Sequence, residues 1–315
     1  METVLANMST VDGKPLPDPE SEWERAPALA SVDRAEVERR VGPIDGPLIV
    51  LDGGQANVNV RIGDRVVRIY RRDASSGARE ARLLTYPWRT FRVPKVFQTG
   101  DDFLVLEYVE NHPVRGTSEH GSAVGRALAE VHSVAFERAG FLDASLRVAR
   151  PFPDLVIALV DHARSLLTTE RCGLPPALCA EVTQALEDKV PALRAAAGPA
   201  VLLHGDFKPA NLHWTSRNEL LVLDWEFAYA GSALSDIGQI LRWRPPEVFV
   251  SAFADNYSAN GGHLVADWRR WAAAFDLVNL AGLLANTIQR GQDASLTTRV
   301  ADVQRRIEET LSTLG

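Results

Sequence analysis

The chain has 315 residues, of which 46% are hydrophobic and 24% charged, as in a soluble globular protein with one large domain or two lobes. The net charge of −7 argues against a general nucleic-acid binder, which would need a basic face. Without a run of about 18 apolar residues, a transmembrane helix is excluded.

The polar, acidic N-terminus lacks the basic region and apolar run of a secretory signal, so secretion is not expected. The two cysteines, Cys172 and Cys179, are too few for a disulfide framework or a four-ligand zinc site. A reducing cytoplasm is therefore the expected location. Residues 1–30 are rich in Pro, Asp, Glu and Ser, and this composition predicts a mobile or loosely docked arm.

A β-rich region follows a short helix that is predicted over 33–41, with Ser31 or Asp33 as its cap. Residues 48–70 alternate apolar and polar residues around two turns, the first of them glycine-rich. This pattern predicts strand, glycine turn, strand, tight hairpin and strand. A helix over 75–84 with a serine cap precedes two more strands over 93–97 and 103–109. We therefore expect an antiparallel sheet with one inserted helix, ending near residue 110.

The rest of the chain has mainly helical periodicity, with apolar residues three and four positions apart. Three short apolar runs interrupt it and predict a β-island. This order predicts an α+β protein with an N-terminal lobe (31–110), a connection at 107–111 and a helical C-terminal lobe (112–315), with the ligand site between the lobes. The expected helices are 119–134, 154–167, 177–196, 232–242, 247–258, 265–288 and 296–314, and the expected strands are 201–203, 211–214 and 219–225.

The segment most informative about chemistry is HGDFKPAN, residues 204–211, on a loop between two apolar strands. It presents Asp206, Lys208 and Asn211 together. A plain polar turn would also place polar residues here, but it would not account for a second acidic element, Asp224, at the end of the strand LLVLD.

This pair of motifs resembles the aminoglycoside phosphotransferase and choline-kinase-like branch of the protein-kinase fold, over about residues 48–240. The resemblance implies a bilobal kinase-like fold and transfer of a phosphoryl group from ATP or GTP. Asp206 would accept a hydrogen bond from the substrate hydroxyl, while Asn211 and Asp224 would hold two Mg²⁺ ions. Lys208 would neutralise the γ-phosphate, or is simply a surface lysine.

Two departures separate this sequence from protein kinases. Gly205 replaces the arginine of H-R-D, and no A-P-E element follows. Both argue against a protein substrate and against control by an activation loop. His204 and Asp236 are expected to brace the catalytic loop, and His132 to be a packed core histidine.

In the N-terminal lobe, Gly53, Gly54 and Asn57 lie where a loop covering the phosphates belongs, although a plain hairpin turn would look the same. With no lysine between Lys14 and Lys95, Arg68 is the candidate cation for the phosphates, and Arg71 and Arg72 could compete. Glu80 would pair with Arg68, unless it is a solvated helix residue.

The run FLVLEYVE, residues 103–110, resembles the strand that enters a kinase hinge. The Glu107 carbonyl and the Val109 N–H would then recognise adenine. An ordinary edge strand is the alternative. Because these contacts are made by the main chain, they do not distinguish ATP from GTP.

The acceptor side carries more acidic than basic residues: seven acidic and four basic residues lie in 224–276, against three and nine in 61–92. This division favours a cationic acceptor, although charged runs are usually solvated faces. Glu226 is the first candidate to bind the acceptor, because it lies two residues after Asp224. Asp154, Trp268 and Trp271 are further candidates, and the tryptophans could equally belong to the core.

The sequence thus predicts an ATP- and Mg²⁺-dependent O-phosphotransferase for a small, cationic, hydroxylated molecule. An aminoglycoside or another cationic antibiotic, such as a basic cyclic peptide, is the leading class, which would give resistance or self-protection. A kinase for choline, homoserine, fructosamine or a sugar remains open, as does a catalytically silent kinase-like module. No nucleic-acid or membrane partner is expected, and a monomer is slightly favoured.

Overall fold

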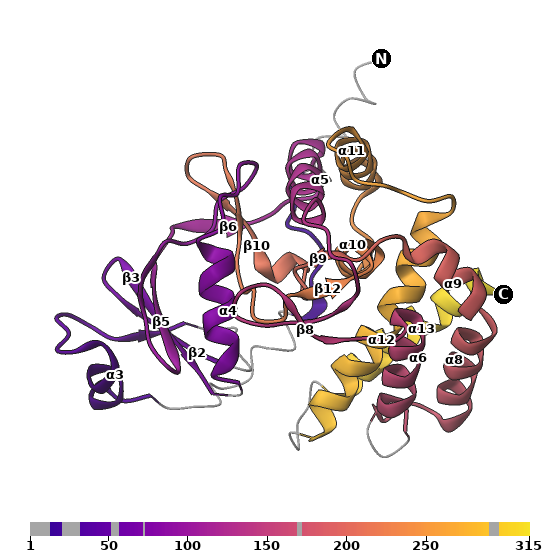
Figure 1. The fold of residues 1–315 in the computed structure, drawn as a ribbon, viewed down its shortest axis with the longest axis horizontal. Coiled ribbons are helices and arrows are strands. Elements are labelled where there is room, and N and C mark those ends of the chain that lie inside the picture. The colour runs from indigo at the N-terminus through magenta and orange to yellow at the C-terminus, as the bar shows by residue number, and fades with distance from the viewer. Residues whose placement is uncertain (1–12, 21–31, 52–56, 72, 169–171, 290–295) are drawn as a thin grey trace.

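The computed structural model describes residues 13–20, 32–51, 57–71, 73–168, 172–289 and 296–315, and has two lobes (Figure 1). A sheet with two helices forms the N-terminal lobe, and a mainly helical lobe with two small sheets follows. The predicted α+β architecture with two lobes is confirmed.

The N-terminal lobe is a five-stranded antiparallel sheet in the order β1-β2-β3-β5-β4. Helix α3 lies at its outer end, and α4 lies between the sheet and the rest of the molecule (Figure 1). The elements are α3 (Arg34–Val41), β1 (Ile49–Val50), β2 (Asn57–Ile62), β3 (Arg65–Tyr70), α4 (Ser75–Leu84), β4 (Val96–Thr99) and β5 (Phe103–Glu107).

Alternation along β3 gives the sheet two different faces. Val67 and Ile69 are buried in a small apolar cluster with Val37 of α3. Successive side chains of a strand point to opposite faces, so Arg68 and Tyr70 face α4 and the other lobe. The strand pattern therefore directs a cation toward the junction between the lobes.

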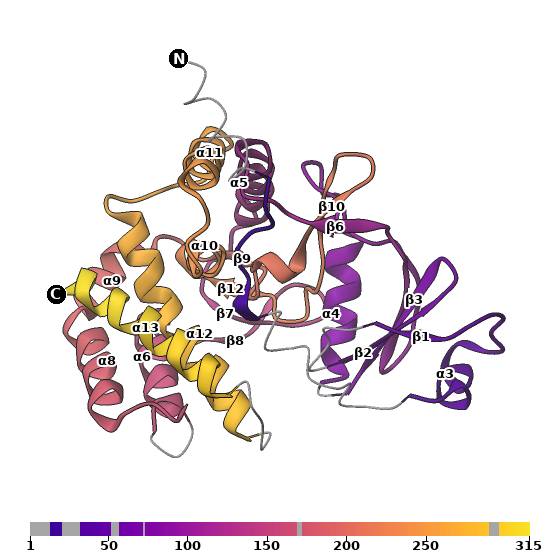
Figure 2. The same ribbon diagram turned by 180° about the vertical axis from the view of Figure 1, so that it is seen from behind.

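The C-terminal lobe packs eight helices of the described chain around two small antiparallel sheets, β11-β10-β6 and β8-β7-β12-β9. Figure 2, seen from behind, shows α13 crossing in front of α12. Its elements are β6 (Asn111–Pro113), α5 (Ser118–His132), β7 (Gly140–Leu142), β8 (Val148–Pro151), α6 (Leu155–Leu166), α8 (Pro176–Asp188), α9 (Val190–Ala197), β9 (Val201–Leu203), the 3₁₀ turn η1 (Pro209–Asn211), β10 (Leu212–Thr215), β11 (Leu220–Val222), β12 (Tyr229–Gly231), α10 (Ala233–Leu241), α11 (Glu247–Ala259), α12 (Trp268–Gln289) and α13 (Leu296–Leu314).

Several details differ from the sequence expectations. Strands β6, β7, β8 and β12 were not predicted, because each has only three or four residues and is defined by its partners. The helix expected over 177–196 is two helices that divide at Lys189, before Pro191. Asp33 caps α3 as predicted, whereas Ala74, not a serine, precedes α4, and no side chain caps it. Within the described residues, no helix is both long and apolar enough to span a bilayer.

The N-terminal arm also differs from expectation where the structure describes it. Leu16 is buried in the main core, and its N–H donates to the Val114 carbonyl oxygen at 3.0 Å. Glu20 is only 1% exposed. This part of the arm is packed into the C-terminal lobe, because an apolar side chain and a set of buried cations hold it there.

Two glycines allow α5 and α11 to pack closely. A Cβ at Gly121 would meet the Phe249 carbonyl oxygen, and one at Gly125 would meet that of Phe253, both far inside van der Waals distance. Backbone atoms cannot move aside as a flexible side chain can. Glycine at these positions therefore sets the distance between the two helices.

We predict that Gly125→Ala lowers the free energy of unfolding by about 2 kcal/mol, because the new methyl group pushes α11 away. Gly282→Ala is the matched control, since its new Cβ would have only an ordinary contact of 3.7 Å with Leu166. There, better helix propensity should raise stability by up to about 1 kcal/mol. Urea unfolding measures both. Equal effects at the two positions would contradict the packing argument.

Candidate active site

The catalytic-loop candidate, residues 204–211, connects two different sheets. β9 ends at Leu203 in one sheet, and β10 starts at Leu212 in the other. The loop therefore lies at the junction of the two sheets. Its turn η1, which begins at Pro209, ends with Asn211.

Helix α10 fixes the path of this loop through two buried side chains. Asp236 accepts hydrogen bonds from the N–H groups of His204 at 2.8 Å and Gly205 at 3.0 Å. Gln239, three residues later on the same helix, accepts from the Phe207 N–H at 2.6 Å and donates to the Gly205 carbonyl at 2.8 Å. The brace predicted for Asp236 is present, and Gln239 extends it.

His204 also has a structural role in this loop. Its Nε2 lies 2.9 Å from the Leu223 carbonyl oxygen, which can only accept, so Nε2 carries the proton. Its Nδ1 then accepts from the Asp206 N–H at 3.3 Å. The ring thereby connects the catalytic loop to the residue before Asp224.

The absence of a side chain at Gly205 has a steric reason. Its φ of +82° is unfavourable for residues with a Cβ, and a Cβ would collide with the Phe227 carbonyl oxygen. An arginine at this position would require the loop or the backbone at Phe227 to move. The sequence departure from H-R-D reflects how closely the loop approaches the segment after Asp224.

Asp206, Lys208 and Asn211 converge at the end of this loop. The Asn211 side-chain amide donates to the Asp206 carbonyl oxygen at 2.8 Å and to its carboxylate Oδ2 at 3.0 Å. The Lys208 Nζ lies 3.4 Å from the same Oδ2. Lys208 is buried rather than a solvated surface lysine, and its ammonium group faces the proposed catalytic carboxylate.

Asp224 is held beside this group by the backbone. The Leu223 N–H donates to the Asn211 carbonyl oxygen at 3.0 Å, so the two motifs lie next to each other. Asp224 has a φ of +64°, in the left-handed region that is uncommon for a non-glycine residue. This turn directs the carboxylate away from the strand β11 and toward the N-terminal lobe.

Arg68 of β3 meets Asp224 across the junction of the lobes. Its guanidinium forms an ion pair with Asp224, and lies 3.1 Å from Glu80 Oε2 of α4 and 3.5 Å from Glu226 Oε1. Burial alone would lower the pKa of Arg68, but Asp224 and Glu80 raise it well above its usual range. The Arg68–Glu80 pair expected from sequence is thus formed. Arg71 pairs instead with Glu36 of α3.

Glu226 lies on the Arg68 side of the site. Its Oε2 accepts from the Asn57 side-chain amide at 2.7 Å, and its Oε1 faces Arg68. Burial and the neighbouring Asp224 carboxylate raise the pKa of Glu226 to about 7. Because the carboxylate is buried and bonded within the protein, in this structure it does not offer a charge to an acceptor.

The donor atoms at this site fit a magnesium ion. The Asn211 amide nitrogen donates to Asp206, which directs the amide oxygen elsewhere, and the Asp224 carboxylate is 28% exposed. Oxygen donors of this kind are what Mg²⁺ prefers, with water and phosphate oxygens completing the shell. Among the described residues, no group of three or more His, Cys, Asp or Glu side chains could hold a metal by itself.

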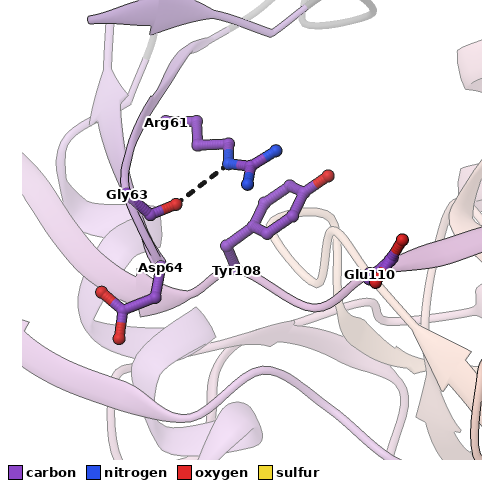
Figure 3. A pocket seen from close by; sticks show the side chains of 5 residues that line it. All are labelled: Arg61, Gly63, Asp64, Tyr108 and Glu110. Atoms are coloured by element: carbon purple, nitrogen blue, oxygen red, sulfur yellow. Dashed lines mark hydrogen bonds between the residues drawn. The ribbon is translucent and has the colours of Figure 1, made fainter. Parts of the chain in front are cut away.

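A pocket of about 460 Å³ lies where the β2–β3 turn meets the hinge (Figure 3). It is lined by Arg61, Gly63, Asp64, Tyr108 and Glu110, and the Arg61 guanidinium carbon lies 3.6 Å from the centroid of the Tyr108 ring. Tyr108 stands between the two predicted adenine-binding positions. A stacked arginine and tyrosine thus border the predicted base site.

Binding of adenine by the main chain of Glu107 and Val109 remains a prediction. The Glu107 carboxylate pairs with Arg92 at 2.6 Å, and its N–H donates to the Lys95 carbonyl at 2.9 Å. Val109 is buried and accepts at its carbonyl from the Asn111 side chain at 2.7 Å. These contacts use atoms other than the Glu107 carbonyl and the Val109 N–H proposed for adenine. Gly53 and Gly54 lie outside the described residues.

The candidate acceptor residues have partners within the protein. Asp154 caps α6, accepting from the Ile157 N–H at 2.9 Å, and pairs with Arg194 at 2.8 Å. Trp268 and Trp271 are partly buried against the main core. An arginine lies over each indole, Arg269 at 5.4 Å and Arg270 at 5.0 Å. These contacts give all three residues structural roles, and their binding of an acceptor remains a prediction.

Comparison with known proteins agrees with this geometry. Residues 48–274, more than half of the chain, match the family described as "Phosphotransferase enzyme family". The chain belongs to this phosphotransferase family. As a member it is an enzyme that transfers phosphoryl groups to hydroxyl groups of small molecules. No curated protein sequence matches the chain.

Solved structures with the same fold share little sequence with this phosphotransferase. The macrolide 2′-phosphotransferase MphH from Brachybacterium faecium is 18% identical, with a TM-score of 0.60, over 81% of this chain and 91% of that one. A putative fructosamine-3-kinase from Thermobifida fusca is 19% identical (TM-score 0.60; 87% and 98%). The GDP and kanamycin complex of APH(2″)-IIIa is 12% identical (TM-score 0.67; 88% and 97%).

Sequence reasoning missed two residues of this site. Gln239 was detectable in principle, because it lies three residues after Asp236 on one helical face. Arg79 of α4 donates to the Glu226 carbonyl at 2.6 Å and to the Leu142 carbonyl at 3.3 Å. No sequence pattern indicates that contact, because it joins three distant segments.

We predict that Asp236→Ala lowers the free energy of unfolding by about 3 kcal/mol, because two buried N–H groups lose their acceptor. Turnover should fall as the loop loses its fixed path. Asp255→Ala, at an exposed position of α11, is the control and should change stability by less than about 0.5 kcal/mol. Urea unfolding and hydrogen exchange at the His204 and Gly205 amides test this. Unchanged amide protection would contradict it.

Proposed function

We propose that this phosphotransferase uses ATP or GTP with Mg²⁺ to phosphorylate a hydroxyl group of a small cationic molecule. One observation carries the proposal: the Asp206 carboxylate, the Asn211 amide and the Asp224 carboxylate lie together opposite Arg68 at the junction of the lobes. Members of this family transfer phosphoryl groups. The cluster contains a group to orient the acceptor hydroxyl, groups to hold the metal ion and a cation to face the phosphates.

Each residue has a role that its position supports. Asp206 accepts a hydrogen bond from the acceptor hydroxyl and receives its proton, since phosphoryl transfer needs an oriented nucleophile more than a strong base. Lys208, 3.4 Å from Asp206, compensates negative charge on the transferred group. Asn211 and Asp224 would hold Mg²⁺, which neutralises phosphate charge when bound.

The nucleotide would lie against the N-terminal lobe. Arg68, with Glu80 fixing its rotamer, faces the phosphates, and Asn57 borders the same space. The guanidinium pairs with Asp224, and binding of a magnesium–nucleotide complex would exchange this ion pair for contacts to phosphate. The base then lies toward the hinge, near the pocket lined by Arg61 and Tyr108.

The acceptor class is supported by the charge of the open face and by the relatives. The Asp206 and Asp224 side chains are 22% and 28% exposed beside their partners Lys208 and Arg68, so carboxylate oxygens at the reacting surface remain accessible to a cation. Similar structures include complexes of aminoglycoside phosphotransferases with kanamycin, gentamicin and streptomycin. We therefore propose an aminoglycoside or another cationic antibiotic, such as a basic cyclic peptide, as the acceptor. A phosphate group would spoil recognition of such a drug by RNA.

A metabolic kinase is the second candidate, because the similar structures also include a putative fructosamine-3-kinase and a choline/ethanolamine kinase family protein. Asp154 caps α6 and pairs with Arg194, so its carboxylate already has a cationic partner within the protein. That observation argues against one contact proposed for a cationic drug. A smaller acceptor is therefore the alternative.

An acceptor panel separates the candidates. Purified protein with Mg²⁺ and ATP or GTP is assayed for nucleoside diphosphate release with aminoglycosides, a basic cyclic peptide, choline, homoserine, a fructosamine and a neutral sugar. We expect the highest kcat/KM with a cationic antibiotic, and a raised inhibitory concentration of that drug in an expressing host. Activity with only a neutral sugar or an amino acid would defeat the antibiotic proposal.

We predict that Asp206→Asn lowers kcat by about 10³-fold or more, while the fold and the nucleotide affinity stay nearly unchanged. Asp224→Asn should in addition weaken magnesium–nucleotide binding. Asp161→Asn, at an exposed position of α6, is the control and should keep wild-type kinetics. Calorimetric nucleotide titration and steady-state kinetics measure the three variants. Near wild-type turnover in Asp206→Asn would show that its assigned role is wrong.

A further inference from the structure

Glu20 lies in the catalytic region although it precedes the family-matched segment, which begins at residue 48. It belongs to the described stretch 13–20, the indigo segment that runs from α5 toward β12 in Figure 2. Backbone contacts hold this stretch in place: Leu16 donates to the Val114 carbonyl at 3.0 Å, and Gly116 donates to that of Lys14 at 3.0 Å. A packed segment thus places Glu20 beside the catalytic loop.

The Glu20 carboxylate contacts the catalytic loop and α10 at once. Its Oε2 lies 3.3 Å from the Lys208 Nζ. Its Oε1 accepts from Arg242 Nη1 at 2.6 Å and from the indole N–H of Trp243 at 2.8 Å. Burial alone would raise the pKa of Glu20, but the charges of Arg242 and Lys208 lower it to about 2. The group is therefore an anion near neutral pH.

The cation on the far side of Glu20 is itself fixed. Arg242 is fully buried at the end of α10 and donates from Nε and Nη2 to the two oxygens of Asp276 on α12, at 2.8 and 2.7 Å. A guanidinium held in this two-pronged way has one orientation. Glu20 consequently has a rigid anchor, and α10 also carries Asp236 and Gln239, which brace the same loop.

The Lys208 ammonium lies between two carboxylates, Glu20 at 3.3 Å and Asp206 at 3.4 Å. A lysine side chain is a flexible four-carbon stem with a point charge, so its position depends on what surrounds the charge. If the side chain at position 20 were neutral, the attraction between Lys208 and Asp206 would no longer be balanced by the Glu20 carboxylate. The ammonium would move closer to Asp206 and occupy the oxygen that must meet the acceptor hydroxyl.

We propose that Glu20 is a positioning residue that holds the Lys208 ammonium between itself and Asp206, so that Lys208 faces the transferred phosphoryl group and leaves Asp206 accessible to the acceptor. The proposal rests on the function proposed above. It extends the catalytic unit of this enzyme to a residue outside the family-matched segment. Glu20 acts through Lys208 and does not itself touch the substrate.

A double-mutant cycle in the full-length enzyme tests the proposal. The variants are Glu20→Gln, Lys208→Met and both together, assayed for kcat and nucleotide KM with an acceptor from the panel and for hydrolysis of Mg²⁺-ATP in water. Glu20→Gln should lower kcat about tenfold and change the nucleotide KM by less than about twofold. In the Lys208→Met background it should have no further effect, because the group through which it acts is gone.

Two more variants make the result specific. Glu20→Asp keeps the charge and should recover part of kcat. If Glu20→Gln does not fold, Glu20→Asp replaces it in the double-mutant cycle. Glu187→Gln removes an ion-paired glutamate on α8, paired with Arg164, and should keep wild-type kcat. A merely structural Glu20 would change the urea midpoint without this pattern. Wild-type kcat in Glu20→Gln, or losses that multiply with Lys208→Met, would overturn the proposal.

Failure of the proposed function would look different. A wild-type protein that neither phosphorylates any acceptor nor hydrolyses ATP contradicts the proposed function. The same cycle measured by urea unfolding then reports the Glu20–Lys208 coupling alone. Stability losses that add without coupling would overturn the contact on which this inference depends.

Discussion

Ion pairs of the buried Arg68 guanidinium join the N-terminal lobe to the C-terminal lobe. The guanidinium comes from β3 and lies among carboxylates from α4 and from the segment after β11, those of Glu80, Asp224 and Glu226. Removing such a cation would leave several buried anions uncompensated, which costs far more than an exposed ion pair contributes. In the proposed function, the same charge that joins the lobes would also meet a nucleotide's phosphates. One group would then serve both the stability of the protein and nucleotide recognition.

The catalytic loop is the second constrained element, and α10 organises it. Asp236 and Gln239 satisfy the loop's backbone groups, and Arg242 at the end of the helix orients Glu20 toward Lys208. Hydrogen bonds of this kind in a dry interior hold a loop rigid, because an unpaired buried N–H is costly. Preorganisation of this sort suits phosphoryl transfer, in which positioning and charge compensation supply most of the rate.

The acceptor side of the enzyme is built differently from what charge patterning suggests. Asp154 and Glu226, both acidic candidates, are bonded to Arg194 and to Asn57 within the protein, and arginines cover both candidate tryptophans. The acidic surface that remains at the reaction centre is that of Asp206 and Asp224 themselves. In the proposed function, acceptor selectivity would therefore depend on groups other than these candidates.

The sequence by itself determined the two lobes, the strands of the N-terminal sheet and the spacing of Asp206, Asn211 and Asp224, because alternation, helical periodicity and short motifs are local properties of the chain. Arg68 was also identifiable, since an alternating strand left one cation on the inward face. Only the tertiary structure decided that Glu20 contacts Lys208, that Glu226 faces Arg68 and that short strands such as β12 exist. Contacts between residues as distant as Glu20 and Lys208 depend on how whole elements pack, and no local pattern encodes that packing.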